Sequence, residues 1–180
     1  HSMILWGPSG VGKTTLARII CAQMGAHFEQ MSAVLDGIKE LRNVIKHAEL
    51  YKQNDKSTIL FVDEIHRFNK AQQDAFLPHI ESGLITLIGA TTENPSFEIN
   101  SSVLSRSRVY ILNKLSDEEL ESIALRAMTD QGVRLESDGS LSLIIHSSDG
   151  DARRLINIIE QLTQKSNKAL DKKEIIKTLQ

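Results

Sequence analysis

With 180 residues, 41% of them hydrophobic, the chain is long enough for one medium-sized domain and a small second one, each with its own core. The formal net charge of −2 excludes a sequence-wide basic field for nucleic acid, although it leaves room for a local basic patch. A single cysteine, Cys21, excludes an internal disulfide. We find no apolar run of membrane-spanning length, no signal peptide and no lipidation motif, so we expect a cytoplasmic protein with no membrane partner.

A glycine-rich run follows the first apolar segment, Met3–Trp6. It fits the phosphate-binding pattern G-x-x-x-x-G-K-[ST] and precedes a helix-like stretch that Gly25 closes. Glycines let backbone N–H groups point at phosphate oxygens, while Lys13 can reach the β and γ phosphates and the Thr14 hydroxyl can coordinate Mg²⁺. We therefore predict binding of ATP with Mg²⁺. The expected nucleotide contacts are Gly7, Pro8, Ser9, Gly10, Val11, Gly12, Lys13, Thr14 and Thr15.

The first two helices are predicted from periodicity. Apolar residues recur at helical spacing over 14–24, and Cys21 falls beside them, which predicts a buried structural thiol. A short strand over 27–31 and a helix over 38–51 follow. The apolar residues expected on the buried side of the first helix are Leu16, Ile19, Ile20 and Met24.

A second signal is the run Ile59–Glu64, in which four apolar residues precede two acids. The lack of alternation predicts a central parallel strand covered on both faces, whose carboxyl end faces the phosphate loop. There Asp63 is expected to hold Mg²⁺, and Glu64 to orient and deprotonate the attacking water. A base for water favours hydrolysis over transfer to a small molecule. The alternative is an ordinary acidic turn after a strand.

Further alternation completes the sheet. We predict a helix over 69–81, a buried strand over 84–90 and a fifth strand over 109–112. After the fourth strand a hydroxyl is placed to sense the γ phosphate. Thr92 is the better candidate, Thr91 is close behind, and a capping threonine is the alternative. Five strands with interleaved helices predict an α/β fold, a doubly wound parallel sheet with right-handed crossovers.

The pattern changes after Asn113. Ser116 and Glu119 form a capping box that opens a helix through about residue 130, and further helices are predicted over 141–146, 151–163 and 171–179. Helices without strands after a complete α/β unit predict a separate small all-helical domain. The expected division is residues 1–113 and residues 114–180.

Six runs of the sequence carry a resemblance to known families: Gly7–Thr14, Ile59–Lys70, Gln73–Glu81, Gly89–Phe97, Ser105–Arg106 and Gly150–Arg154. Together they resemble a clamp-loader-type AAA+ ATPase with its helical lid. More narrowly, the chain resembles the replication-associated recombination protein A family, over nearly its whole length and most densely over 59–110.

This resemblance implies further site residues. Arg106 would be an arginine finger for the γ phosphate of a neighbouring subunit, with Arg108 as its rival and a surface arginine that pairs with an acid as the alternative. Ser107 stands where the clamp-loader motif has cysteine. Arg153 would be a lid arginine that contacts the phosphates of its own subunit, with Arg154 as the fallback. Ser32, after the second strand, would restrain Glu64 until DNA arrives.

The resemblance also implies a function. It implies a DNA-dependent ATPase acting at stalled replication forks in recombination and repair, on forked or gapped DNA or single-stranded ends, as a tetramer in a bacterial, nucleoid-associated setting. Partners would include repair proteins such as single-strand binding protein. The alternative is an ATP-gated binding module that recruits such proteins, with hydrolysis as a timer. A small-molecule kinase and a Holliday-junction motor fit less well.

Relative to that family, the chain matches the core and lid. An N-terminal segment that helps to hold the adenine and a C-terminal region that drives tetramer assembly have no counterpart here. We therefore expect weak nucleotide affinity and weak hydrolysis from the chain in isolation.

Overall fold

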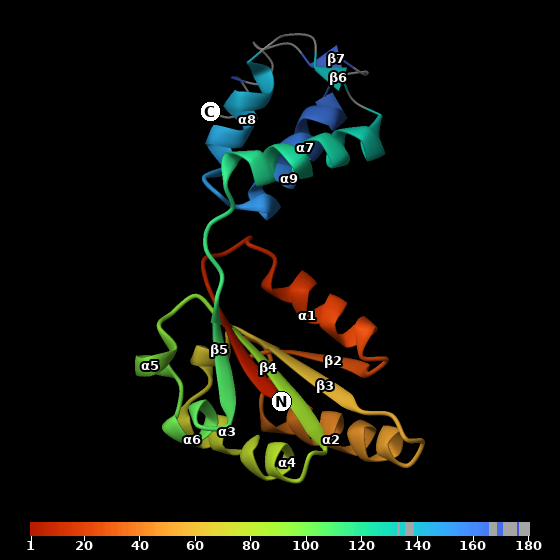
Figure 1. The fold of residues 1–180 in the computed structure, drawn as a ribbon, viewed down its shortest axis with the longest axis vertical. Helices are drawn as coiled ribbons and strands as arrows, with labels where there is room; N and C mark the ends of the chain where they lie inside the picture. Colours follow the sequence, from red (N-terminus) through yellow and green to blue (C-terminus); the bar gives the residue numbers. More distant parts are fainter. Residues whose placement is uncertain (133, 136–138, 166–168, 171–175, 177–180) are drawn as a thin grey trace. The chain divides into compact units, whose positions relative to one another are not determined.

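The computed structural model describes residues 1–132, 134–135, 139–165, 169–170 and 176. The chain forms two compact units (Figure 1). The first contains His1–Gly7 and Gly12–Leu112, and the second contains Pro8–Val11 and Asn113–Gln180. Each unit has its own hydrophobic core.

The first unit is built on a five-stranded sheet in the spatial order β2-β3-β4-β1-β5, in which all neighbouring strands run parallel. This confirms the predicted doubly wound α/β sheet. β4 lies between β1 and β3, so the carboxyl ends of these three strands meet at one edge. The strands are β1 (Ser2–Trp6), β2 (His27–Ser32), β3 (Thr58–Asp63), β4 (Ile85–Thr91) and β5 (Ser107–Ile111).

Helices cover both faces of the sheet (Figure 1). Ile59 and Phe61 of β3 pack in the cluster that includes α1, while Leu60 and Val62 pack in the cluster that includes α2 and α4. All four are buried, which is why this strand reads as a continuous apolar run. The helices are α1 (Lys13–Gln23), α2 (Ile38–Lys52), η1 (Ile65–Arg67), α3 (Lys70–Asp74), α4 (Leu77–Glu81), α5 (Pro95–Glu98) and α6 (Ser101–Leu104).

The face through which helix α1 packs only partly matches the predicted one. Ala17 and Cys21, one turn apart, are buried, and the predicted Ile20 packs against their cluster. By contrast, Leu16, Ile19 and Met24 are 37%, 51% and 57% exposed. Small side chains let the helix lie close to the sheet, which leaves the larger residues at its flanks. Burial of Cys21 is therefore confirmed, and burial raises the pKa of its thiol. The prediction that Leu16 and Met24 share its buried side is wrong.

The segment 69–81 forms two short helices, α3 and α4, instead of one. Asn69 caps α3, since its side chain accepts a hydrogen bond from Gln72 N at 2.9 Å while Gln72 Oε1 accepts one from Asn69 N. Pro78 has no N–H to donate to a carbonyl four residues earlier, so it stands in the first turn of a new helix.

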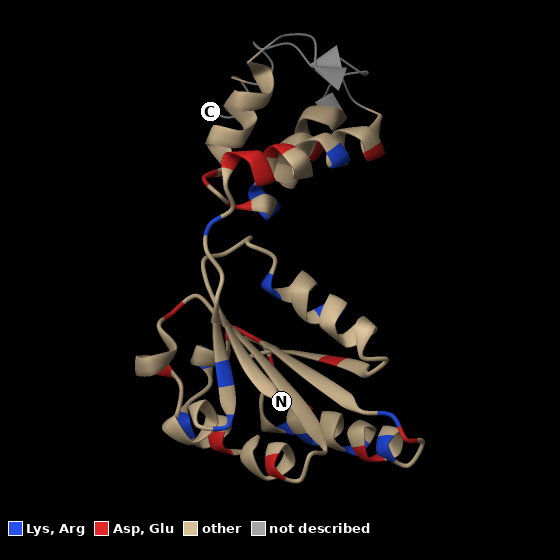
Figure 2. Cartoon of the chain, viewed as in Figure 1, with Lys and Arg blue, Asp and Glu red and all other residues tan. Residues whose placement is uncertain are grey.

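The second unit includes the helices α7 (Asp117–Gln131), α8 (Ser140–Ser148) and α9 (Ala152–Lys165). The predicted capping box opens α7, and acidic side chains gather in its first turn (Figure 2). A short parallel pairing of β6 (Arg134–Leu135) with β7 (Ala169–Leu170) was not predicted. The predicted helix over 171–179 falls mostly outside the described residues. The buried residues of this core are Leu120, Ala124, Met128, Ile144, Ile145, Leu155, Ile158, Ile159 and Leu162.

Among the described residues, no helix combines the length and the apolar character that crossing a membrane requires.

Candidate active site

The loop after β1 is anchored at its first residue. Gly7 N donates to Thr91 O of β4 at 3.1 Å, and Leu112 N, directly after β5, donates to Trp6 O at 2.7 Å. The start of the loop is therefore hydrogen-bonded on both sides. A Cβ on Gly7 would overlap the Leu112 carbonyl oxygen. Glycine is therefore required here by the close approach of two backbones.

The loop ends at the start of α1. Gly10 and Gly12 have φ values of 69° and 95°, in the left-handed region that favours glycine. Gly12 is the N-cap of α1, which has no side-chain cap and no acidic residue in its first turn. The first N–H groups of an α-helix have no partner within the helix, so Lys13, Thr14 and Thr15 begin a helix suited to binding an anion. The Lys13 ammonium donates to Gly7 O at 2.7 Å, and this side chain is buried.

Within the second unit, Pro8–Val11 lies against the start of α9. Ser9 Oγ donates to Asp151 Oδ2 at 2.9 Å, and Ala152 N donates to Gly10 O at 3.1 Å. Asp151 Oδ1 also accepts from Arg154 N at 2.9 Å, as an N-cap residue does. One aspartate thus bonds both to the loop and to the start of a helix. The predicted lid arginine, Arg153, is exposed one residue beyond this contact.

The two predicted acids lie where β3 leaves the sheet. Asp63 ends the strand, and Glu64 has φ 52° and ψ 43°, a left-handed conformation that is uncommon for a residue other than glycine. Such outliers concentrate at functional sites, where the surrounding structure holds them. Trp6 pairs with Thr91 across β1 and β4, and Val62 with Gly89 across β3 and β4. The register therefore brings the ends of β1 and β3 to either side of the end of β4.

Three side chains connect the end of β4 to Glu64. Thr92 Oγ1 donates to Glu64 Oε2 at 3.5 Å, and His66 Nε2 lies 3.3 Å from the same oxygen. Thr91 Oγ1 lies 2.9 Å from His66 Nδ1. Sequence reasoning assigned no role to His66; the available signal was its position two residues after the predicted base. Both threonines named as candidate sensors thus connect to Glu64, Thr92 directly and Thr91 through the imidazole.

Ser32 makes other contacts. Its backbone N–H donates to Asp36 Oδ2 at 2.7 Å, and its hydroxyl accepts from Val34 N at 3.4 Å. These bonds stabilise the turn after β2. The polar side-chain contacts of Glu64 are instead with His66 and Thr92.

Arg106 lies near the amino ends of the strands, opposite the ends that carry the candidate site. It immediately precedes β5, whose first residue, Ser107, pairs with Ser2 at the start of β1. With about 3.3 Å per residue, the five residues of β1 place Arg106 about 16 Å along the strand direction from the end of β1. Its guanidinium pairs with Glu81, at 2.8 Å from Nε and 2.7 Å from the second terminal nitrogen, and donates to Ser102 O at 2.9 Å. Arg106 and Gly7 therefore lie at opposite ends of the strands.

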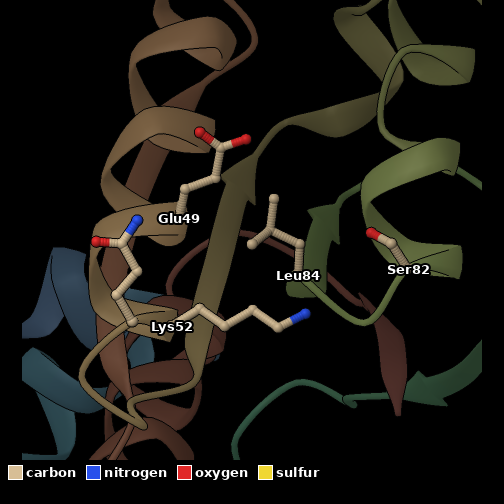
Figure 3. A pocket seen from close by; sticks show the side chains of 5 residues that line it. Glu49, Lys52, Ser82 and Leu84 are labelled. Carbon is tan, nitrogen blue, oxygen red and sulfur yellow. The ribbon is translucent and has the colours of Figure 1, made fainter.

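A hollow of about 460 Å³ also lies away from the loop, between the end of α2 and the turn before β4 (Figure 3). The Lys52 side chain extends from α2 toward Leu84 in this view. Leu84 precedes β4, so the hollow is at the amino edge of the sheet and does not belong to the candidate site. It is lined by Glu49, Lys52, Gln53, Ser82 and Leu84.

Among the described residues, no group of three or more His, Cys, Asp or Glu side chains is placed to hold a metal ion by itself. Mg²⁺ bound with a nucleotide ordinarily uses one or two protein oxygens together with phosphates and water. The hydroxyl of Thr14 and the carboxylate of Asp63 are oxygen donors of that kind, so the residues present fit such an ion.

A parallel sheet with a glycine-rich loop after β1 and acids after β3 is the arrangement of a nucleotide-binding ATPase of the phosphate-loop class. The chain belongs to the AAA family, the ATPase family associated with various cellular activities, whose model matches residues 3–115. Membership of this family implies nucleotide binding.

Particular relatives narrow the class. The chain is 53% identical over 169 residues to the replication-associated recombination protein A of Escherichia coli (strain K12), covering 90% of this chain and 38% of that protein. It is 47% identical over 173 residues to ATPase WRNIP1 of Dictyostelium discoideum, covering 93% of this chain and 20% of that protein. The chain thus spans well under half the length of these relatives, and the predicted resemblance is confirmed.

Among solved structures, the RuvB Holliday junction branch migration motor of Thermotoga maritima matches with a TM-score of 0.80 at 29% identity. The match covers 99% of this chain and 60% of that one.

Proposed function

We propose that the chain is the nucleotide-hydrolysing part of an ATPase that acts on DNA during replication-associated recombination. The observation that carries the proposal is the meeting of three strand ends, which supports a role for the loop base, Glu64 and Thr92 in one site. Lys13 would bind the β and γ phosphates, and Thr14 and Asp63 would hold Mg²⁺, which supplies charge neutralisation when bound.

Hydrolysis would use Glu64 as the general base. A carboxylate accepts a proton from water only when it lies within hydrogen-bond reach, so the orientation of this side chain decides the rate. Thr92 donates to the same carboxylate, and its hydroxyl would also sense the γ phosphate, which would link the orientation of Glu64 to the bound nucleotide. The remaining loop residues, from Gly7 to Thr15, would supply backbone N–H groups, and Arg153 would contact the phosphates from the lid.

Arg106 would act on the nucleotide of a neighbouring subunit. The position of Arg106 at the amino ends of the strands supports this proposal, and a surface ion pair with Glu81 is the alternative that the Arg106→Ala variant tests. Its bonds to Glu81 and Ser102 O orient the guanidinium at the amino edge of the sheet. A closed ring or tetramer in the full-length protein would bring that edge against the neighbouring loop.

The DNA substrate is proposed from the relatives' names, which speak of replication-associated recombination and of a Holliday junction motor. Stalled forks with gapped or single-stranded ends are the proposed substrate class, and single-strand binding protein a proposed partner. An ATP-gated binding module, which recruits repair proteins and uses hydrolysis as a timer, is the competing outcome of the experiment below.

The test is ATP turnover by the full-length protein with and without forked DNA. We expect DNA to stimulate turnover, and Glu64→Gln and Arg106→Ala each to lower it by at least about 10²-fold. Mixing the two variants should restore turnover, because each supplies the group that the other lacks. Arg108→Ala is the matched control at the rival arginine and should retain turnover.

Turnover that ignores DNA and survives Arg106→Ala would remove the shared site and favour the binding module. Loss of turnover in Arg108→Ala instead of Arg106→Ala would transfer the finger role to Arg108.

A further inference from the structure

A series of polar contacts runs from the end of β4 through a buried imidazole to Glu64. The His66 side chain is 7% exposed, whereas the Glu64 side chain is 32% exposed. His66 Nε2 lies 3.3 Å from Glu64 Oε2, and His66 Nδ1 lies 2.9 Å from Thr91 Oγ1. The imidazole is thus held by the protein interior on one side and contacts a half-exposed carboxylate on the other.

The chemistry of these groups limits where the protons can lie. An ionised carboxylate only accepts, so a hydrogen bond between His66 and Glu64 needs the hydrogen on Nε2. The Thr91 hydroxyl accepts from Glu93 N at 3.0 Å and donates to Glu93 O at 3.2 Å, and it also lies 2.9 Å from His66 Nδ1. Because its single hydrogen has two acceptors within reach, Thr91 holds the ring in place without selecting its tautomer.

The geometry gives these contacts a task. Glu64 has a left-handed backbone, and its hydrogen bond from Thr92 is long at 3.5 Å. This bond and the contact with His66 are both made by Oε2, so within the described residues Oε1 is left for a water molecule. A donor fixed by burial restricts the carboxylate better than a donor on the surface.

We propose that His66 is a positioning residue: its Nε2–H fixes the carboxylate of Glu64 for attack by water, and Thr91 holds the His66 ring at Nδ1. This inference rests on the proposed function, because it gives Glu64 the role of general base. It differs from that function in assigning the orientation of the base to a histidine and to Thr91.

The test uses the full-length protein with three substitutions at these contacts. His66→Phe keeps an aromatic ring and removes the donor, so kcat should fall about 10- to 100-fold, as expected for a misplaced catalytic group. The Kd for ATP should change less than about twofold, because the polar contacts of His66 are with Thr91 and Glu64. His66→Gln places an amide N–H near the position of Nε2 and should recover most of kcat. Thr91→Val should lower kcat in the same direction by a smaller factor.

The matched control is His47→Phe, a half-exposed histidine on α2, which should leave kcat and the Kd for ATP unchanged. The decisive comparison is the double substitution. A residue that acts through Glu64 adds nothing once Glu64 is removed, so His66→Phe should not lower further the residual rate of Glu64→Gln.

Several results would overturn the proposal. Unchanged kcat in His66→Phe, or a fall in kcat that His66→Gln fails to recover, would remove the positioning role. An equal loss from His66→Phe with and without Glu64→Gln would show that His66 acts elsewhere. If His66→Phe fails to fold, Thr91→Val tests the proposal in its place, and an unchanged kcat in Thr91→Val would refute the positioning role. Retained turnover in Glu64→Gln alone would instead refute the proposed base, which separates the two failures.

Discussion

The base of the phosphate loop is a place where one methyl group should damage the protein. In Gly7→Ala, the new Cβ would overlap the Leu112 carbonyl oxygen and lie 3.1 Å from its carbonyl carbon and from Leu112 Cβ. Gly7 is not among the glycines with positive φ, so alanine meets no backbone strain of its own. The whole effect therefore comes from this contact, in which one backbone meets another.

The cost follows from what must move. Gly7 N is bonded to Thr91 O, and Leu112 N to Trp6 O, so separating the two backbones stretches bonds on both sides. Overpacking costs typically 1–3 kcal/mol and a weakened hydrogen bond about 1 kcal/mol, so we expect a loss of about 2–4 kcal/mol in the free energy of unfolding. The loop base moves with it, and ATP affinity should fall about tenfold, equivalent to about 1.4 kcal/mol.

The measurements are urea unfolding and titration of a fluorescent ATP analogue. Two glycines serve as controls: Gly37, where the nearest atom to a new Cβ is 3.8 Å away, and Gly25, where nothing lies within 4 Å but φ is 61°. We expect Gly37→Ala to cost less than about 1 kcal/mol. Gly25→Ala should cost about 1 kcal/mol from backbone strain alone. A Gly7→Ala protein that unfolds like the wild type would refute the reasoning.

Three further predictions concern charge and burial. Lys13→Met keeps the apolar stem and removes the ammonium. Because hydrogen bonds to charged groups contribute about 1.5–3 kcal/mol, the Kd for ATP, measured by calorimetry, should rise about 10²-fold. An unchanged Kd would show that Lys13 does not bind the phosphates. Burial of Cys21 raises the pKa of its thiol, so the folded state holds the thiol proton more tightly. The free energy of unfolding should therefore fall as pH rises above the thiol pKa of the unfolded chain, about 8.5. If urea unfolding shows that the wild type and Cys21→Ala lose the same stability between neutral pH and pH values above this pKa, the prediction is wrong. The Lys114 ammonium, bonded to Asp149 at 2.9 Å, lowers the pKa of that carboxyl, so its small contribution is present above the unfolded pKa and is lost as pH falls through the folded one. Lys114→Met should raise the pKa of Asp149, which NMR titration of the carboxyl carbon measures, and an unmoved titration would exclude the bond in solution.

Much of the fold and of the loop could be predicted because local chemistry specifies them. The apolar run of β3 has no alternation, since both of its faces are covered, and that pattern is visible in four residues. The capping box of Ser116 and Glu119 is likewise a contact between neighbours in sequence. The loop requires glycine, lysine and threonine at fixed spacing, so its residues can be named from the sequence alone.

Other features depend on which distant residues meet. The periodicity of α1 indicates two apolar sides, and only the approach of the sheet selects the side with Ala17 and Cys21 over the side with Leu16 and Met24. The split of 69–81 follows from Pro78 but also from where α3 and α4 must lie against the sheet.

The candidate site shows the same division. Motif and strand end are both local, so the sequence alone predicts Asp63 and Glu64 at the end of one strand and Lys13 in the loop that follows another. The position of β4 between β1 and β3, which brings Thr91 to His66 and Thr92 to Glu64, is visible only in the structure. The order of strands in a sheet arises from long-range pairing, which no short window of sequence encodes.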